Sequence, residues 1–164
     1  MTDLELRLRL TEGQALAATM FGEGAGLPVE GRLAVGSVVR NRLVVPNRFG
    51  GRWRDVCHQR AQFSCWWKFG GVENHARLMK LCAALVTHGD LDGVLTPTER
   101  AIWGECLFLA EGFIAGRLRD RVHGATHYFN PDAMVPAGSA PAWAVGAPIC
   151  VVGDRPQQHR FYRA

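Results

Sequence analysis

Long apolar runs are missing from this sequence. No stretch approaches the length of about 18 apolar residues that a membrane-spanning helix requires. The first ten residues alternate charged and leucine side chains, and they lack the apolar segment of a secretory signal peptide. We therefore expect a chain that is made in the cytoplasm and does not insert into a membrane. Any substrate outside the cytoplasm would have to be reached through another component.

Closely spaced cysteine pairs are also absent. The five cysteines are odd in number and lie far apart, at Cys57, Cys65, Cys82, Cys106 and Cys150. No Cys-x2-Cys spacing suggests a zinc site, and adjacent Cys57 and His58 cannot easily bind one ion together. We expect reduced thiols, with Cys82 and Cys106 in the core. The sequence predicts neither a metal ion nor another cofactor.

Lysine is scarce, and the basic residues form no dense run. Arginine accounts for 17 of the 19 basic residues, and the net charge is +4. Arg117, Arg119 and Arg121 lie closest together, while the other arginines are scattered. Dispersed positive charge attracts anionic partners weakly, whereas nucleic-acid binding needs a contiguous basic patch. We expect no nucleic-acid partner.

The length of 164 residues predicts a single domain over residues 1–164. Apolar periodicity predicts a helical body followed by a smaller lobe of loops and short strands, which is a mainly helical α+β fold. Alternating leucines at 4–10 would also fit a short strand, and Pro46 is expected to end the second helix. The expected helices cover residues 2–22, 29–45, 73–88 and 97–115, with an irregular segment at 47–72 and short strands after Gly116.

A single carboxylate stands among glycines at the end of an apolar helix pattern over residues 11–21, whose start Thr11 can cap. The sequence there is Met20-Phe21-Gly22-Glu23-Gly24-Ala25-Gly26, and three glycines are expected to end the helix just before Glu23. Because glycine has no side chain, a substrate would be able to approach the carboxylate closely. Apolar neighbours would favour the protonated form of the acid. Glu23 is thus a candidate general acid, although an idle, solvated glutamate is the simpler alternative. A phosphate-binding loop is excluded because no Gly-Lys-Ser/Thr follows.

Two segments mix polar and aromatic side chains in the way that carbohydrate sites do. They are Gln62-Phe63-Ser64 and Thr126-His127-Tyr128-Phe129-Asn130. Aromatic faces stack on sugars while hydroxyl, amide and imidazole groups bind their polar substituents. The same segments allow a second interpretation, in which Cys65, His127 and Asn130 form a thiol hydrolase site. A helix start that would activate Cys65 is not evident, so a structural cysteine is expected.

Segments 16–23, 30–42, 62–66, 124–130, 143–144 and 159–162 resemble, in this order, the SleB-like cell wall hydrolase family of spore-cortex-lytic enzymes and phage proteins. The resemblance spans roughly residues 15–162. It implies a lysozyme-related helical body and a smaller lobe that together form a cleft. It also implies cleavage of peptidoglycan between N-acetylmuramic acid and N-acetylglucosamine, with Glu23 as the acid. The implied substrate-binding residues are Gln62, Phe63, Ser64, Thr126, His127, Tyr128, Asn130, Trp143, His159 and Tyr162.

Where this family commonly carries a second acidic residue, the sequence has Gly24-Ala25-Gly26-Leu27. Hydrolysis of a glycosidic bond usually needs two carboxylates, whereas a lytic transglycosylase works with one. We therefore expect a monomeric lytic transglycosylase or muramidase, acting on the wall after release from the cell or as part of a phage-like particle. A cysteine-type amidase or peptidase using Cys65 and His127, and a non-catalytic wall-binding phage protein, remain the alternatives.

Overall fold

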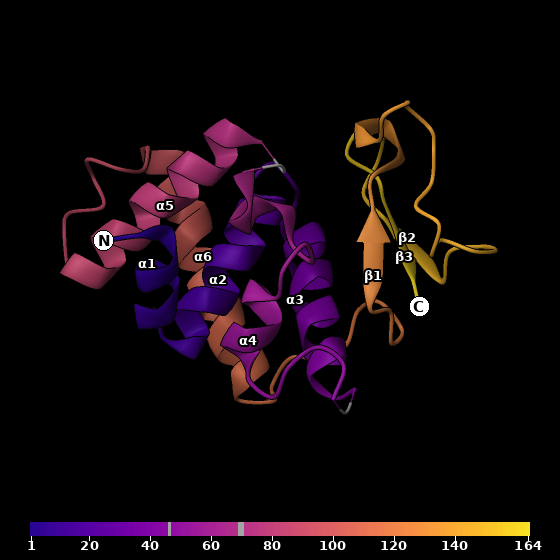
Figure 1. Ribbon diagram of the computed structural model, residues 1–164, viewed down its shortest axis with the longest axis horizontal. Coiled ribbons are helices and arrows are strands. Elements are labelled where there is room, and N and C mark those ends of the chain that lie inside the picture. The colour runs from indigo at the N-terminus through magenta and orange to yellow at the C-terminus, as the bar shows by residue number, and fades with distance from the viewer. Residues whose placement is uncertain (46, 69–70) are drawn as a thin grey trace.

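Helices form most of the chain in the computed structural model, which describes residues 1–45, 47–68 and 71–164. The helices pack on one side and a small antiparallel sheet lies on the other (Figure 1). This arrangement confirms the mainly helical α+β class. The predicted helix end at Pro46 falls outside the described residues. The α-helices are α1 (Asp3–Arg9), α2 (Glu12–Gly24), α3 (Val29–Leu43), α4 (Trp53–His58), α5 (Val72–Thr87) and α6 (Pro97–Ile114).

The continuous helix predicted over residues 2–22 is wrong, because two helices occupy this region, but the predicted cap Thr11 does begin the second. Thr2 caps α1 and Thr11 caps α2. Each threonine forms a capping box with the residue three positions later, which is Glu5 in α1 and Gln14 in α2. Leu10 between them has extended backbone angles. The strand alternative for the alternating leucines is also wrong, since Leu6 and Leu10 are buried one helical turn apart.

The predicted helix end before Glu23 is wrong as well. Helix α2 continues through Gly24, so Glu23 lies in its last turn instead of in a loop. The glycines serve close packing: a Cβ atom on Gly22 would lie 2.6 Å from the Cβ atom of Cys65. Carbonyl groups in the last turn of a helix lack intrahelical partners. Here Gly22 O accepts from Asn74 Nδ2 at 3.1 Å and Gly24 O accepts from the Leu27 amide at 3.0 Å.

Helix α2 lies at the centre of the helical body and packs against α3, α4, α5 and α6. Its side chains Leu16, Met20 and Phe21 are fully buried, and Cys82 and Cys106 are buried as predicted. The segment expected to be irregular contains α4 and a short 3-10 helix, η1 (Ser64–Trp66). In the part of the chain that the structure describes, no helix is long and apolar enough to cross a membrane.

The strands are β1 (His127–Phe129), β2 (Cys150–Val152) and β3 (His159–Tyr162), in the spatial order β1-β3-β2. Another 3-10 helix, η3 (Pro131–Ala133), follows β1. Tyr128 pairs with Phe161 and His127 pairs with Tyr162. Because side chains alternate between the two faces of a strand, neighbouring residues of β1 have different surroundings. This alternation decides which part of the aromatic segment meets the helical body.

Candidate active site

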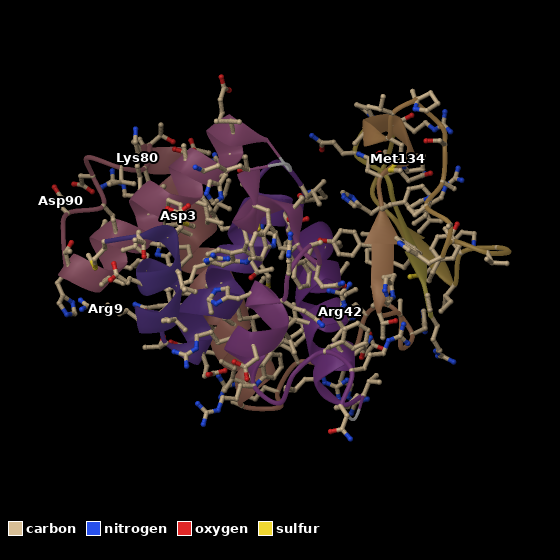
Figure 2. The ribbon with its side chains drawn as sticks, viewed as in Figure 1. Asp3, Arg9, Arg42, Lys80, Asp90 and Met134 are labelled. Carbon is tan, nitrogen blue, oxygen red and sulfur yellow. The ribbon has the colours of Figure 1, made fainter. Side chains whose placement is uncertain are left out.

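A cavity of about 580 Å³ lies where the end of α2, the start of α5 and the sheet lobe meet. Glu23 is on the helical side and Tyr128 is on the sheet side. Met134, labelled in Figure 2, lines the cavity from the side of the lobe. The residues that line it are Gly22, Glu23, Ala61, Gln62, Ser64, Asn74, Tyr128, Phe129, Asn130, Ala133, Met134 and His159.

The half-buried carboxylate of Glu23 accepts three hydrogen bonds. Its Oε1 atom accepts from the Ser64 hydroxyl at 3.0 Å and from the Cys65 backbone N–H at 2.7 Å. Its Oε2 atom accepts from the Tyr128 hydroxyl at 2.9 Å. Donors on both oxygens fix the orientation of the carboxyl group and stabilise its negative charge.

The two donors to Oε1 come from the start of η1. Phe63, directly before this 3-10 helix, is fully buried and anchors it, while Ser64 remains exposed beside the cavity. Gly22 lets the backbone of Cys65 approach α2 closely enough to bond Glu23. The glycine beside Glu23 therefore brings a backbone donor to the carboxylate.

Tyr128 reaches Glu23 from the face of the sheet that meets the helices. Its ring stacks on Phe161, with centroids 5.4 Å apart, and it contacts the His159 ring at the same distance. Burial, and then the negative charge of Glu23, raise the pKa of Tyr128 well above its ordinary value of 10.0. The phenol therefore stays protonated near neutral pH and acts as a donor to the carboxylate.

Other predicted binding residues also line this cavity, namely Gln62, Asn130 and His159. Asn130 is held by two local bonds: its Nδ2 atom donates to Pro156 O at 2.9 Å, and its Oδ1 atom accepts from the Asp132 amide at 2.9 Å. His159 Nδ1 lies 3.0 Å from Gln157 O. A carbonyl oxygen only accepts, so Nδ1 carries the proton. Burial lowers the pKa of His159, which favours the neutral ring with an unprotonated Nε2.

The remaining predicted binding residues lie outside the cavity lining. Phe63 is in the core, and the Thr126 carbonyl accepts from buried Arg42 at 2.6 Å. An aromatic cluster forms on the face of β1 away from Tyr128, where Trp143 contacts the rings of three neighbours. The members of this cluster are His127, Phe129, Trp143 and Tyr162.

Cys65 and His127, the thiol and the imidazole of the thiol-hydrolase alternative, both pack as structural residues. The Cys65 side chain is fully buried, and burial raises the pKa of its thiol well above the ordinary 9.0. His127 bonds Thr126 Oγ1 through Nδ1 and packs against Phe49 and Trp143. Burial lowers the pKa of His127 to about 4, assisted by the positive charge of Arg42. A protonated thiol and a neutral imidazole lack the features that activate a cysteine nucleophile.

Sequence reasoning missed Asn74 and Arg42. Asn74 stands at the start of a helix, a common place for a polar residue, and nothing local indicates that it faces Glu23. Arg42 is buried between the rings of Phe49 and Phe63, at 5.2 and 4.7 Å from their centroids. Its Nη1 atom has no hydrogen-bond partner in the described chain. A buried arginine among aromatic residues has no local sequence signature, so only the fold reveals it.

Among the described residues, the carboxylates other than Glu23 are not part of this cavity lining. Glu30 lines a separate cavity of about 490 Å³ with Arg121 and Val151. Asp132 lies 3.9 Å from Arg155 in an ion pair on the lobe. Over residues 1–45, 47–68 and 71–164, no cluster of three or more His, Cys, Asp or Glu side chains is arranged to hold a metal ion.

Comparison with known proteins identifies one family. Residues 26–162 match the family model described as Cell Wall Hydrolase, so the match covers most of the chain and confirms the SleB-like resemblance. The match begins three residues after Glu23, and it includes every other predicted site residue. Neither a curated protein nor a solved structure matched the chain.

Proposed function

We propose that this chain, which belongs to the cell wall hydrolase family, cleaves the glycan strand of peptidoglycan between N-acetylmuramic acid and N-acetylglucosamine. Glu23 would serve as the general acid and then as the base. The observation that carries the proposal is the geometry of Glu23, whose carboxylate accepts three hydrogen bonds at the edge of an open cavity.

In the first half of the reaction, a protonated Glu23 transfers its proton to the glycosidic oxygen as the bond from this oxygen to C1 of muramic acid breaks. The carboxylate that results is stabilised by Ser64, the Cys65 amide and Tyr128. These donors are already in place, so little reorganisation is needed when the negative charge develops. The positive charge that grows at C1 is then close to a carboxylate.

In the second half, the ionised Glu23 takes the proton of the 6-hydroxyl group of muramic acid. The oxygen of that hydroxyl attacks C1 and closes a 1,6-anhydro ring, so the acid returns to its protonated state. This route needs one carboxylate, and Glu23 is the only acidic residue among the described residues that line the cavity. We therefore favour a lytic transglycosylase over a two-carboxylate muramidase.

Peptide-stem cleavage by Cys65 and His127 receives less support. The thiol is buried and its pKa is raised, and His127 faces away from the cavity lining. Simple wall binding would not require a carboxylate held by three donors beside an open cavity. Both alternatives also make different experimental predictions.

Digestion of purified peptidoglycan tests the proposal. Wild-type protein should release fragments that mass spectrometry identifies as anhydro-muropeptides, whereas Glu23→Gln should release none while keeping its fold. Glu30→Gln, which alters a carboxylate at the separate cavity, is the matched control and should keep its activity.

Cys65→Ala separates the glycan and peptide activities, because its backbone N–H can still donate to Glu23. It should release the same fragments as the wild type. Release by Glu23→Gln, or release of free stem peptides that stops in Cys65→Ala, would refute the proposal. Fragments with reducing ends would keep Glu23 as the acid but replace the anhydro step by hydrolysis.

A further inference from the structure

A side-chain relay reaches the backbone next to Glu23 from two other helices. Asn74 of α5 donates its Nδ2–H to the Gly22 carbonyl oxygen at 3.1 Å. The Gly22 carbonyl belongs to the peptide group whose nitrogen is that of Glu23. Asn74 therefore bonds directly to the peptide unit that carries the candidate acid.

The orientation of the Asn74 amide is determined by its other partner. Its Oδ1 atom accepts from Arg77 Nη2 at 3.2 Å, which leaves the amide nitrogen facing Gly22. Arg77 is anchored in turn by Glu99 Oε1 of α6 at 2.7 Å, and its guanidinium lies 5.1 Å from the centroid of the Phe21 ring. The chain Glu99–Arg77–Asn74 thus links α6 and α5 to the end of α2.

The last turn of α2 needs such support. Glycines stand on both sides of Glu23, and glycine restricts the backbone less than any other residue. A helix also offers no partner of its own to its final carbonyl groups. Without Asn74, the Gly22 carbonyl would have to be satisfied by water, and the backbone at Glu23 would lose a tertiary constraint.

We propose that Asn74 is a positioning residue for Glu23, oriented by Arg77 and Glu99. The inference rests on the proposed role of Glu23 as the acid. A glutamate misplaced by about 1 Å can lose a large part of its catalytic effect, so the relay contributes to kcat more than to substrate binding. Asn74 acts through the peptide group of Gly22, whereas Ser64 and Tyr128 act on the carboxylate itself.

Two variants of nearly the same shape test this role. Asn74→Asp can still accept from Arg77 but cannot donate to the Gly22 carbonyl, and Asn74→Leu removes both bonds without adding charge. Each should lower kcat by roughly tenfold or more with KM changed less than about twofold, at a nearly unchanged thermal midpoint. Lys80→Leu, an exposed substitution on the same helix, should behave as the wild type. Arg77→Met should lower kcat less, and its effect should not add to that of Asn74→Leu.

The amide resonance of Glu23 gives a second readout that is independent of catalysis. Its 1H and 15N shifts should move in both Asn74 variants and stay in place in Lys80→Leu, because the Gly22 carbonyl shares its peptide group. Full activity of Asn74→Leu would overturn the inference. A loss of activity in Asn74→Asp alone would also overturn it, because the effect would then come from the added negative charge. If the wild type cleaves no glycan, the proposed function fails. Whether or not glycan is cleaved, an unchanged amide shift of Glu23 in Asn74→Leu would reject the positioning role of Asn74.

Discussion

Tyr128 donates its phenol hydroxyl to Oε2 of Glu23 at 2.9 Å, although the two residues are 105 positions apart in the sequence. One comes from the last turn of a central helix and the other from the first strand of the sheet lobe. This bond therefore connects the two parts of the fold across the cavity. It also makes the environment of the acid depend on how the lobe packs against the helices.

Replacing Tyr128 with Phe should lower kcat by roughly tenfold to a hundredfold. The change removes a hydrogen bond to a charged group, which is worth about 1.5–3 kcal/mol. The ring itself would still stack on Phe161, so the thermal midpoint should change little. Steady-state release of glycan fragments measures the effect.

Ser64→Ala provides the comparison for Tyr128→Phe. Oε1 of Glu23 would keep its shorter bond from the Cys65 amide, so the loss in kcat should be smaller. Equal losses in the two variants would contradict a special role for Tyr128. Loss of folding in Tyr128→Phe, seen as a large drop in thermal midpoint, would point to packing instead.

Gly22→Ala should destabilise the protein and reduce its activity together. The added methyl group would meet Cys65 Cβ at 2.6 Å and Cys65 Sγ at 2.9 Å, and overpacking of this kind costs about 1–3 kcal/mol. Relief of the clash would move Cys65 and its N–H away from Glu23. Urea unfolding and fragment release measure the two effects.

Gly104→Ala is the matched control for Gly22→Ala. Gly104 is also a helical glycine, but a Cβ atom there has open space around it. The substitution should raise the free energy of unfolding by about 0.5–1 kcal/mol, since alanine favours helix. A stable, fully active Gly22→Ala variant would show that the close approach of Cys65 is not required.

Stability should fall as the pH drops below about 6.5, and His58 should contribute to this fall together with His127 and His159. Burial, and then the positive charges of Arg7 and Arg54, lower the pKa of His58 from 6.5 to about 3. Between these values the unfolded chain binds a proton that the folded chain does not. The free energy of unfolding should therefore decrease by up to about 1.4 kcal/mol per pH unit for this residue.

Urea unfolding at several pH values measures this slope in the wild type and in His58→Phe. Phenylalanine can keep a ring against Trp66, which the His58 ring contacts at 4.4 Å, but it does not titrate. The slope should become smaller without vanishing, because the lowered pKa of His127 acts in the same direction. An identical slope in the variant would contradict the assignment to His58.

Several elements of the fold were predictable because their signals are local. The capping box of Thr96 and Glu99 marked the start of α6, and apolar periodicity located α3 and α5 to within about two residues. The break between α1 and α2 was predicted only in part. Thr11 was correctly expected to cap a helix, but the leucines before it continue an apolar pattern and hid the end of α1.

The candidate site was predictable only in part. The sequence singled out Glu23 and the segments 62–64 and 126–130, and the fold brings members of all three together. It did not indicate that only some residues of each segment would line the cavity. Strand alternation sends Tyr128 toward Glu23 and His127 toward Trp143, and which face meets the helices depends on how the sheet packs.

The sequence by itself determined the helical character of the chain, its family and the presence of a single carboxylate among glycines. Those properties depend on residue types and on short spacings. Only the tertiary structure decided that Gly22 packs against Cys65, that Glu23 lies in the last turn of a helix, and that Asn74 supports it. The physical reason is that these contacts join residues at least 40 positions apart, and their geometry depends on how whole helices and strands pack.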